Sequence, residues 1–161
     1  MVYNIRSMLG FCSFLVMTIY LMLTASEDSK SCEVTRLKHL IGGVPAGTML
    51  LIYVKDRSLV DLGVLVLFIL LCLLIGAMGI YGMADGFVFA NLIVLFGGMS
   101  GIAGIGLVVL IMVLACFSGM IELLLQKFMT GARLIGKKHI AFIPHILTGY
   151  ISVMIALIIW F

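Results

Sequence analysis

Residues 62–125 read LGVLVLFILLCLLIGAMGIYGMADGFVFANLIVLFGGMSGIAGIGLVVLIMVLACFSGMIELLL, and this stretch decides the fold. Only Asp85 and Glu122 are charged in it. As one continuous helix it would be about 96 Å long, roughly three times the hydrocarbon core of a bilayer. The chain therefore turns twice within the stretch. Glycines offer the turns at residues 82–86 (Gly-Met-Ala-Asp-Gly) and 97–101 (Gly-Gly-Met-Ser-Gly).

Composition extends this prediction to the whole chain. The 161 residues are 64% hydrophobic and 11% charged, whereas a soluble domain is about 25% charged. Mean hydropathy is +1.34. A chain of this length has room for about six short spans and little else. We therefore expect an all-α, polytopic membrane protein of one domain, residues 1–161, with six transmembrane helices and short loops. The expected spans are residues 8–25, 38–54, 62–81, 86–98, 102–125 and 140–161.

The distribution of basic residues predicts how the spans are oriented in the membrane. With six spans, the connections at 26–39, 82–85 and 126–139 share one membrane face. That face carries seven basic residues: Lys30, Arg36, Lys38, Lys127, Arg133, Lys137 and Lys138. The other face carries three: Arg6, Lys55 and Arg57. The positive-inside rule then predicts a plasma-membrane protein with its amino terminus outside and the richer face in the cytoplasm. Basic residues beside spans favour lipid headgroups as partners, and we expect no nucleic acid.

Asp28 and Asp85 are the candidate catalytic residues. Two spans separate them, so both are expected on the cytoplasmic face. A charge kept beside apolar spans is costly and usually functional. Two carboxylates held close together share a proton, so that one can activate water while the other polarises a carbonyl group. The alternatives are an ordinary juxtamembrane acid at Asp28 and, at Asp85, a loop acid or one that starts a helix. The sequence leaves open which aspartate would be acid and which base.

Small residues surround the second aspartate. Gly82, Ala84 and Gly86 are expected to shape the site, and Gly82 could let the chain approach a substrate backbone closely. Packing between helices is the alternative for Gly82 and Gly86, which are four residues apart. The three histidines are scattered and lack cysteine partners, so we expect neither a metal nor a cofactor.

Three segments together resemble the type IV prepilin peptidases and the archaeal preflagellin peptidases. They are Asp28 with the polar, basic stretch behind it, Gly82-Met83-Ala84-Asp85 between two spans, and residues 143–149 (Ile-Pro-His-Ile-Leu-Thr-Gly) in the last span. Members of this family are membrane aspartic proteases whose second catalytic aspartate lies in Gly-x-Gly-Asp. The order and spacing of the three segments cover nearly the whole chain.

The resemblance implies that Asp28 and Asp85 cleave the short basic leader of a pilin-like precursor at the cytoplasmic face. Larger bacterial members also N-methylate the new terminus and carry a cysteine-bearing insertion. This chain has no such insertion, so we expect an endopeptidase without methyltransferase activity.

The chain also departs from the family pattern. Ala84 stands where a glycine is usual, Phe87 stands where a lysine is usual, and Val34-Thr35-Arg36 replaces an isoleucine-proline-asparagine run. Two other classes therefore stay open: a catalytically inactive subunit or assembly factor of a pilus or secretion system, and a small transporter with Asp85 as its ion site. The oligomeric state is left open as well.

Overall fold

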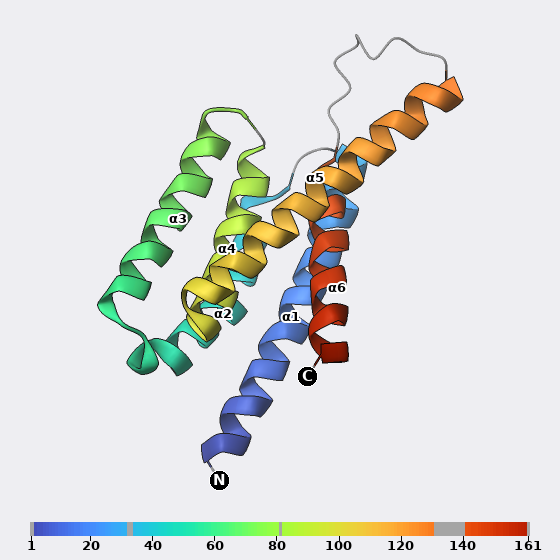
Figure 1. Ribbon diagram of the computed structural model, residues 1–161. Coiled ribbons are helices and arrows are strands. Elements are labelled where there is room, and N and C mark those ends of the chain that lie inside the picture. The colour runs from blue at the N-terminus through green and yellow to red at the C-terminus, as the bar shows by residue number, and fades with distance from the viewer. Residues whose placement is uncertain (1, 32–33, 81, 131–140, 161) are drawn as a thin grey trace.

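The computed structural model describes residues 2–31, 34–80, 82–130 and 141–160, and nearly all of these residues are helical (Figure 1). The described ranges contain no strand, so the predicted all-α class is confirmed for them. The helices are α1 (Val2–Ser31), α2 (Arg36–Tyr53), α3 (Leu59–Ala77), α4 (Met83–Ser100), α5 (Ile102–Thr130) and α6 (Ile143–Trp160), with one 3-10 turn, η1 (Val54–Asp56), after α2.

Five of these helices, α1 to α5, are long and apolar enough to cross a membrane. The sixth, α6, is also apolar but shorter. The chain reverses between α3 and α4 and between α4 and α5, as predicted, but the first reversal lies between Ala77 and Met83 and not over 82–86. The long apolar stretch 62–125 is thus divided among three antiparallel helices, α3, α4 and α5 (Figure 1).

The first helix is longer than predicted. We expected a span over 8–25 and a loop over 26–39, but α1 continues to Ser31 and α2 begins at Arg36. The Ser29 hydroxyl donates a hydrogen bond to the carbonyl oxygen four residues earlier at 2.8 Å, and Ser31 does the same at 3.1 Å. Serine side chains bonded in this way are compatible with a continuing helix. Asp28 therefore lies on a helix and not in a loop.

The fourth helix is also longer than the predicted span 86–98. It begins at Met83, so Asp85 lies in its first turn and only Gly82 precedes it as the capping residue. At its other end we expected a turn over 97–101, but α4 continues to Ser100. The turn is made at Gly101, whose φ of +62° is a backbone conformation that favours glycine. The chain passes from α4 into α5 through this one residue.

Further boundaries differ from the prediction: α3 ends at Ala77 and not at 81, and α6 begins at Ile143 and not at 140. The third helix starts at Leu59 and not at residue 62, because Ser58 and Asp61 form a capping box in which each side chain accepts the other's backbone N–H. The fifth helix runs to Thr130, beyond the predicted end at 125. Most of the predicted basic loop 126–139, with Arg133, Lys137 and Lys138, lies outside the described residues.

The fourth helix is the centre of the arrangement. It packs against α2, α3 and α5, while α1 packs against α2 and α6, and α6 packs against α5 (Figure 1). Glycines allow close approaches between these helices. A Cβ on Gly98 would lie 3.0 Å from the Leu50 backbone, and one on Gly104 would lie 1.9 Å from the Phe96 carbonyl oxygen. The α4–α5 contact therefore depends on Gly104.

This dependence can be tested with Gly104→Ala. The added methyl group has to push α4 and α5 apart, so we expect the free energy of unfolding to fall by about 1–3 kcal/mol. Thermal or denaturant unfolding in detergent measures it. Gly106→Ala is the matched control, since a Cβ at Gly106 meets nothing within 4 Å. Alanine there should leave stability unchanged or raise it by up to about 1 kcal/mol. Equal stability of the two variants would contradict the close α4–α5 contact.

Candidate active site

Asp85 is buried, with 7% of its surface exposed. Its Oδ2 accepts a hydrogen bond from the Gly82 N–H at 3.0 Å, the contact expected of an acid in the first turn of a helix. A Cβ on Gly82 would lie 3.0 Å from the same oxygen, so any other residue would crowd the carboxylate. The absence of a side chain at Gly82 thus leaves room for Asp85 at the start of α4.

Asp28 is equally buried, with 6% of its surface exposed. Its Oδ2 accepts a hydrogen bond from the Ile143 N–H at 3.0 Å. Ile143 is the first residue of α6, so Asp28 satisfies a backbone donor that the helix itself leaves unpaired. The carboxylate also lies at the end of α6 where the helix dipole favours negative charge. This role of Asp28 could not be read from the sequence.

The structure brings the two aspartates to the same end of the bundle. The last turns of α1 and the first turns of α4 and α6 lie at this end (Figure 1). Both carboxylates are buried there. Each is held by a backbone amide at a helix start, Asp28 at α6 and Asp85 at α4. Two carboxylates that share one site can also share a proton.

The other predicted site residues surround Asp85. Ala84 is half-buried and packs against the hydrophobic core, and Gly86 is buried. The Gly86 N–H donates to the Gly82 carbonyl oxygen at 3.2 Å. Phe87, one turn into α4, stacks on the His39 ring with centroids 5.2 Å apart. These residues are therefore neighbours of Asp85 in the first turns of α4, and none of the described contacts assigns them a chemical role.

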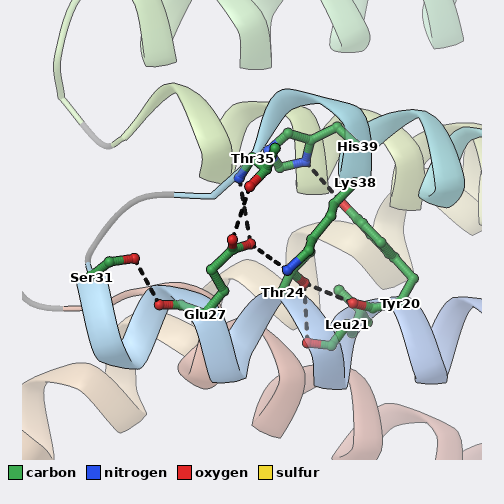
Figure 2. A network of polar contacts seen from close by, with 8 residues as sticks. All are labelled: Tyr20, Leu21, Thr24, Glu27, Ser31, Thr35, Lys38 and His39. Carbon is green, nitrogen blue, oxygen red and sulfur yellow. Dashed lines mark hydrogen bonds and ion pairs between the residues drawn. The ribbon is translucent and has the colours of Figure 1, made fainter.

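Polar contacts fix the end of α1 against the start of α2 (Figure 2). The Glu27 carboxylate forms an ion pair with Lys38 at 2.7 Å and accepts a hydrogen bond from the Thr35 hydroxyl at 2.9 Å. Two turns deeper, the Tyr20 hydroxyl and His39 Nδ1 are hydrogen-bonded at 2.9 Å. Because Glu27 directly precedes Asp28, these contacts help to position the first aspartate. Glu27 is engaged by α2 and by the connection before it.

An apolar groove of about 950 Å³ lies between α2 and α4, beside the first turn of α4. Two of its residues, Met83 and Phe87, flank Asp85 in the sequence. The groove is lined by Leu37, His39, Leu40, Gly43, Val44, Met83, Phe87 and Asn91. Apolar periodicity along one helix does not indicate such a groove, because two helices have to pack together to form it.

No metal site is visible in the part of the chain that the structure describes, where no three His, Cys, Asp or Glu side chains could hold an ion together. His145, the histidine nearest the aspartates in the family-like segment 143–149, has protein partners. Its Nδ1 and the Ser118 hydroxyl are hydrogen-bonded at 3.0 Å, and its Nε2 lies 3.0 Å from a Glu122 carboxylate oxygen.

The fold and the site define an all-helical protein with long apolar helices and a pair of buried aspartates at one end of the bundle. Comparison with protein-family models, curated proteins and solved structures finds no match. The arguments about function therefore rest on the residues themselves.

The capping role of Asp28 predicts different effects for two substitutions. Asp28→Ala removes the acceptor of the buried Ile143 N–H, so we expect the free energy of unfolding to fall by about 1–3 kcal/mol and amide exchange at Ile143 to accelerate. Asp28→Asn keeps an acceptor oxygen and should lose less. Asp56→Ala breaks an exposed ion pair with Arg6 and should change stability by less than about 1 kcal/mol. Unchanged exchange at Ile143 in Asp28→Ala would contradict the cap.

Proposed function

We propose that this protein is a membrane-embedded aspartic endopeptidase, a short and divergent relative of the type IV prepilin peptidases and preflagellin peptidases. It would cleave the basic leader of a pilin-like precursor without methylating the product. One observation carries this proposal: Asp28 and Asp85, far apart in the chain, are both buried at the same end of the bundle, where each accepts a hydrogen bond from a backbone N–H at a helix start.

The backbone hydrogen bonds to the two carboxylates support the chemistry. The reaction needs one ionised carboxylate to activate water and one protonated carboxyl group to polarise the scissile carbonyl. Backbone N–H groups of Gly82 and Ile143 hold Asp85 and Asp28, so both side chains are positioned before a substrate arrives. Positioning of this kind lowers the cost of reaching the reactive geometry. The mechanism uses only the chain's own carboxylates and water.

The α2–α4 groove supports a membrane-anchored substrate. It presents exposed apolar side chains such as Leu40 and Val44 and lies beside the first turn of α4, which carries Asp85. We place the apolar helix of the precursor along this groove, with the scissile bond just ahead of it at the aspartates. The leader, being basic, would then lie beyond the end of the bundle.

We further propose six spans in the plasma membrane, with α6 as the sixth, the amino terminus outside and the aspartates on the cytoplasmic side. The excess of basic residues in the connections predicted on that side supports this orientation. On the opposite face, Arg6 pairs with Asp56 at 3.0 Å, and Arg57 donates to the Gly98 carbonyl oxygen at 3.2 Å. Two of the three basic residues of that face are therefore engaged within the protein.

An inactive subunit or assembly factor is the second candidate function. The stacking of Phe87 on His39 favours it, because a neutral aromatic contact fills the position where the family has a lysine. A transporter fits less well, because an ion site in mid-membrane would place Asp85 deeper than the first turn of α4. The two experiments that follow separate these candidates from a peptidase.

The first experiment replaces each aspartate. Co-expression with a pilin-like precursor should show leader removal, and Asp28→Asn and Asp85→Asn should each lower its rate by at least about 100-fold. The control is Asp56→Asn, on the opposite face, which should process normally. Folding is monitored by the thermal midpoint in detergent. Undiminished processing in both site variants would refute the peptidase and favour the assembly factor.

The second experiment follows the rate of processing against pH. We expect a bell-shaped rate profile with its maximum at acidic pH. Activity should fall at low pH because both carboxyl groups become protonated, and at higher pH because both become ionised. A flat profile across this region would argue against a carboxylate pair, even if the protein copurifies with the precursor.

A further inference from the structure

We propose that Asn91 determines which precursors the protein binds: its side-chain oxygen accepts a hydrogen bond from a serine or threonine hydroxyl on the precursor's apolar helix. This inference rests on the proposed peptidase function, because it takes that helix to lie in the α2–α4 groove. It concerns a side chain that the peptidase mechanism does not use. The Asn91 amide lies on the wall of a groove whose other lining residues are mostly apolar.

The orientation of the Asn91 amide is fixed by α2. Asn91 is half-buried on α4, and its Nδ2 donates a hydrogen bond to the His39 carbonyl oxygen at 3.1 Å. His39 is held in turn, since its Nδ1 and the Tyr20 hydroxyl are hydrogen-bonded at 2.9 Å (Figure 2). A side-chain amide has its donor nitrogen on one side and its acceptor oxygen on the other. With the nitrogen bound to α2, the oxygen is left for another partner.

Two neighbouring glycines of α2 make room for this amide. A Cβ on Gly42 would lie 2.7 Å from Asn91 Nδ2, so α2 can approach the amide only because residue 42 has no side chain. A Cβ on Gly43 would lie 3.9 Å from Asn91 Oδ1, and Gly43 lines the groove as Asn91 does. None of the residues that the structure describes donates a hydrogen bond to Oδ1. The oxygen therefore lies beside a groove residue that has no side chain to cover it.

An acceptor without a partner favours a ligand that brings a donor. In apolar surroundings an unpaired polar atom is costly, and hydroxyl and amide side chains form hydrogen bonds between membrane helices. An amide oxygen only accepts, so it gives no favourable contact to an ionised carboxylate. A serine or threonine hydroxyl suits an apolar helix, because it can bond to a carbonyl oxygen of its own helix until it is bound. A hydroxyl-bearing precursor helix is therefore the ligand that fits the groove.

The position of Asn91 determines where this hydroxyl has to lie. Asn91 is six residues after Asp85, which is about 9 Å along α4. The precursor's helix follows its leader and runs away from the aspartates, in the same direction as α4. With the scissile bond at Asp85, a residue about six positions into that helix is level with Asn91. Adjacent positions point elsewhere, because successive residues of a helix are about 100° apart.

The first test moves one threonine along a precursor whose helix is otherwise leucine and valine. Threonine is placed in turn from about the fourth to the eighth position after the scissile bond, and the full-length protein processes each precursor. One position near the sixth should be processed about three- to tenfold faster than the threonine-free precursor, the range for one hydrogen bond between membrane helices. In Asn91→Leu the rates for the two precursors should become equal.

Two glycine variants test the same contact while Asn91 stays in place. Gly43→Val adds methyl groups beside Oδ1 and should also abolish the preference for threonine. Gly47→Val, one turn further along α2, is the matched control and should keep it, since a Cβ at Gly47 meets nothing within 4 Å. The thermal midpoint in detergent monitors folding. This pair decides the question even where Asn91→Leu does not fold.

A binding measurement separates this inference from the peptidase. Peptides that begin after the scissile bond cannot be cleaved there, so their affinity for the full-length protein in detergent reports recognition of the helix alone. The peptide with threonine at the preferred position should bind about three- to tenfold more tightly than the threonine-free peptide. This difference should vanish in Asn91→Leu and in Gly43→Val.

The possible outcomes distinguish the two proposals. Equal binding of all peptides to the unmodified protein, or a threonine preference that persists in Asn91→Leu, would overturn the role of Asn91. A threonine preference in binding that depends on Asn91, without processing of any precursor, would refute the peptidase and support the role of Asn91 in recognising a helix.

Discussion

The hydrogen bond from the Ile143 N–H to the Asp28 carboxylate is the contact on which the site depends. It joins the first helix of the chain to the last, and much of the other contact between α1 and α6 is apolar packing. In apolar surroundings a backbone donor without a partner is expensive, so this bond fixes the start of α6 against the end of α1. It also fixes the first aspartate relative to the second.

Asp28 therefore has a structural contact in addition to the catalytic role that we propose for it. Asp28 holds the start of α6, and Asp85 holds the start of α4 through Gly82. Both carboxylates lie at helix starts, where the helix dipole favours negative charge. An aspartate that caps a helix has little freedom to move, and this rigidity is what a shared proton and a positioned water require. The capping contact is thus compatible with the catalytic role that we propose for the same buried residue.

Local signals in the sequence were enough for the helices and the turns at Gly82 and Gly101, because apolar runs and glycines act over a few residues. These signals did not predict that α1 continues to Ser31. The Ser29 and Ser31 hydroxyls donate hydrogen bonds within the last turns of the helix, but serines do not produce an apolar pattern in the sequence. The Asp28 cap joins residues 115 positions apart, and the His145 contact with Ser118 joins residues 27 positions apart. Such partners are set by how the helices pack.

The fourth helix determines the position of the second aspartate. At its start, Asp85 accepts from Gly82, and at its end the Arg57 guanidinium donates to the carbonyl oxygens of Gly98 and Met99. A cation at this end also matches the helix dipole. Since both ends are held and the helix is buried among its neighbours, the position of Asp85 is determined by α4 as a whole. Ala84 and Phe87 belong to the same helix, so their positions are determined together with that of Asp85.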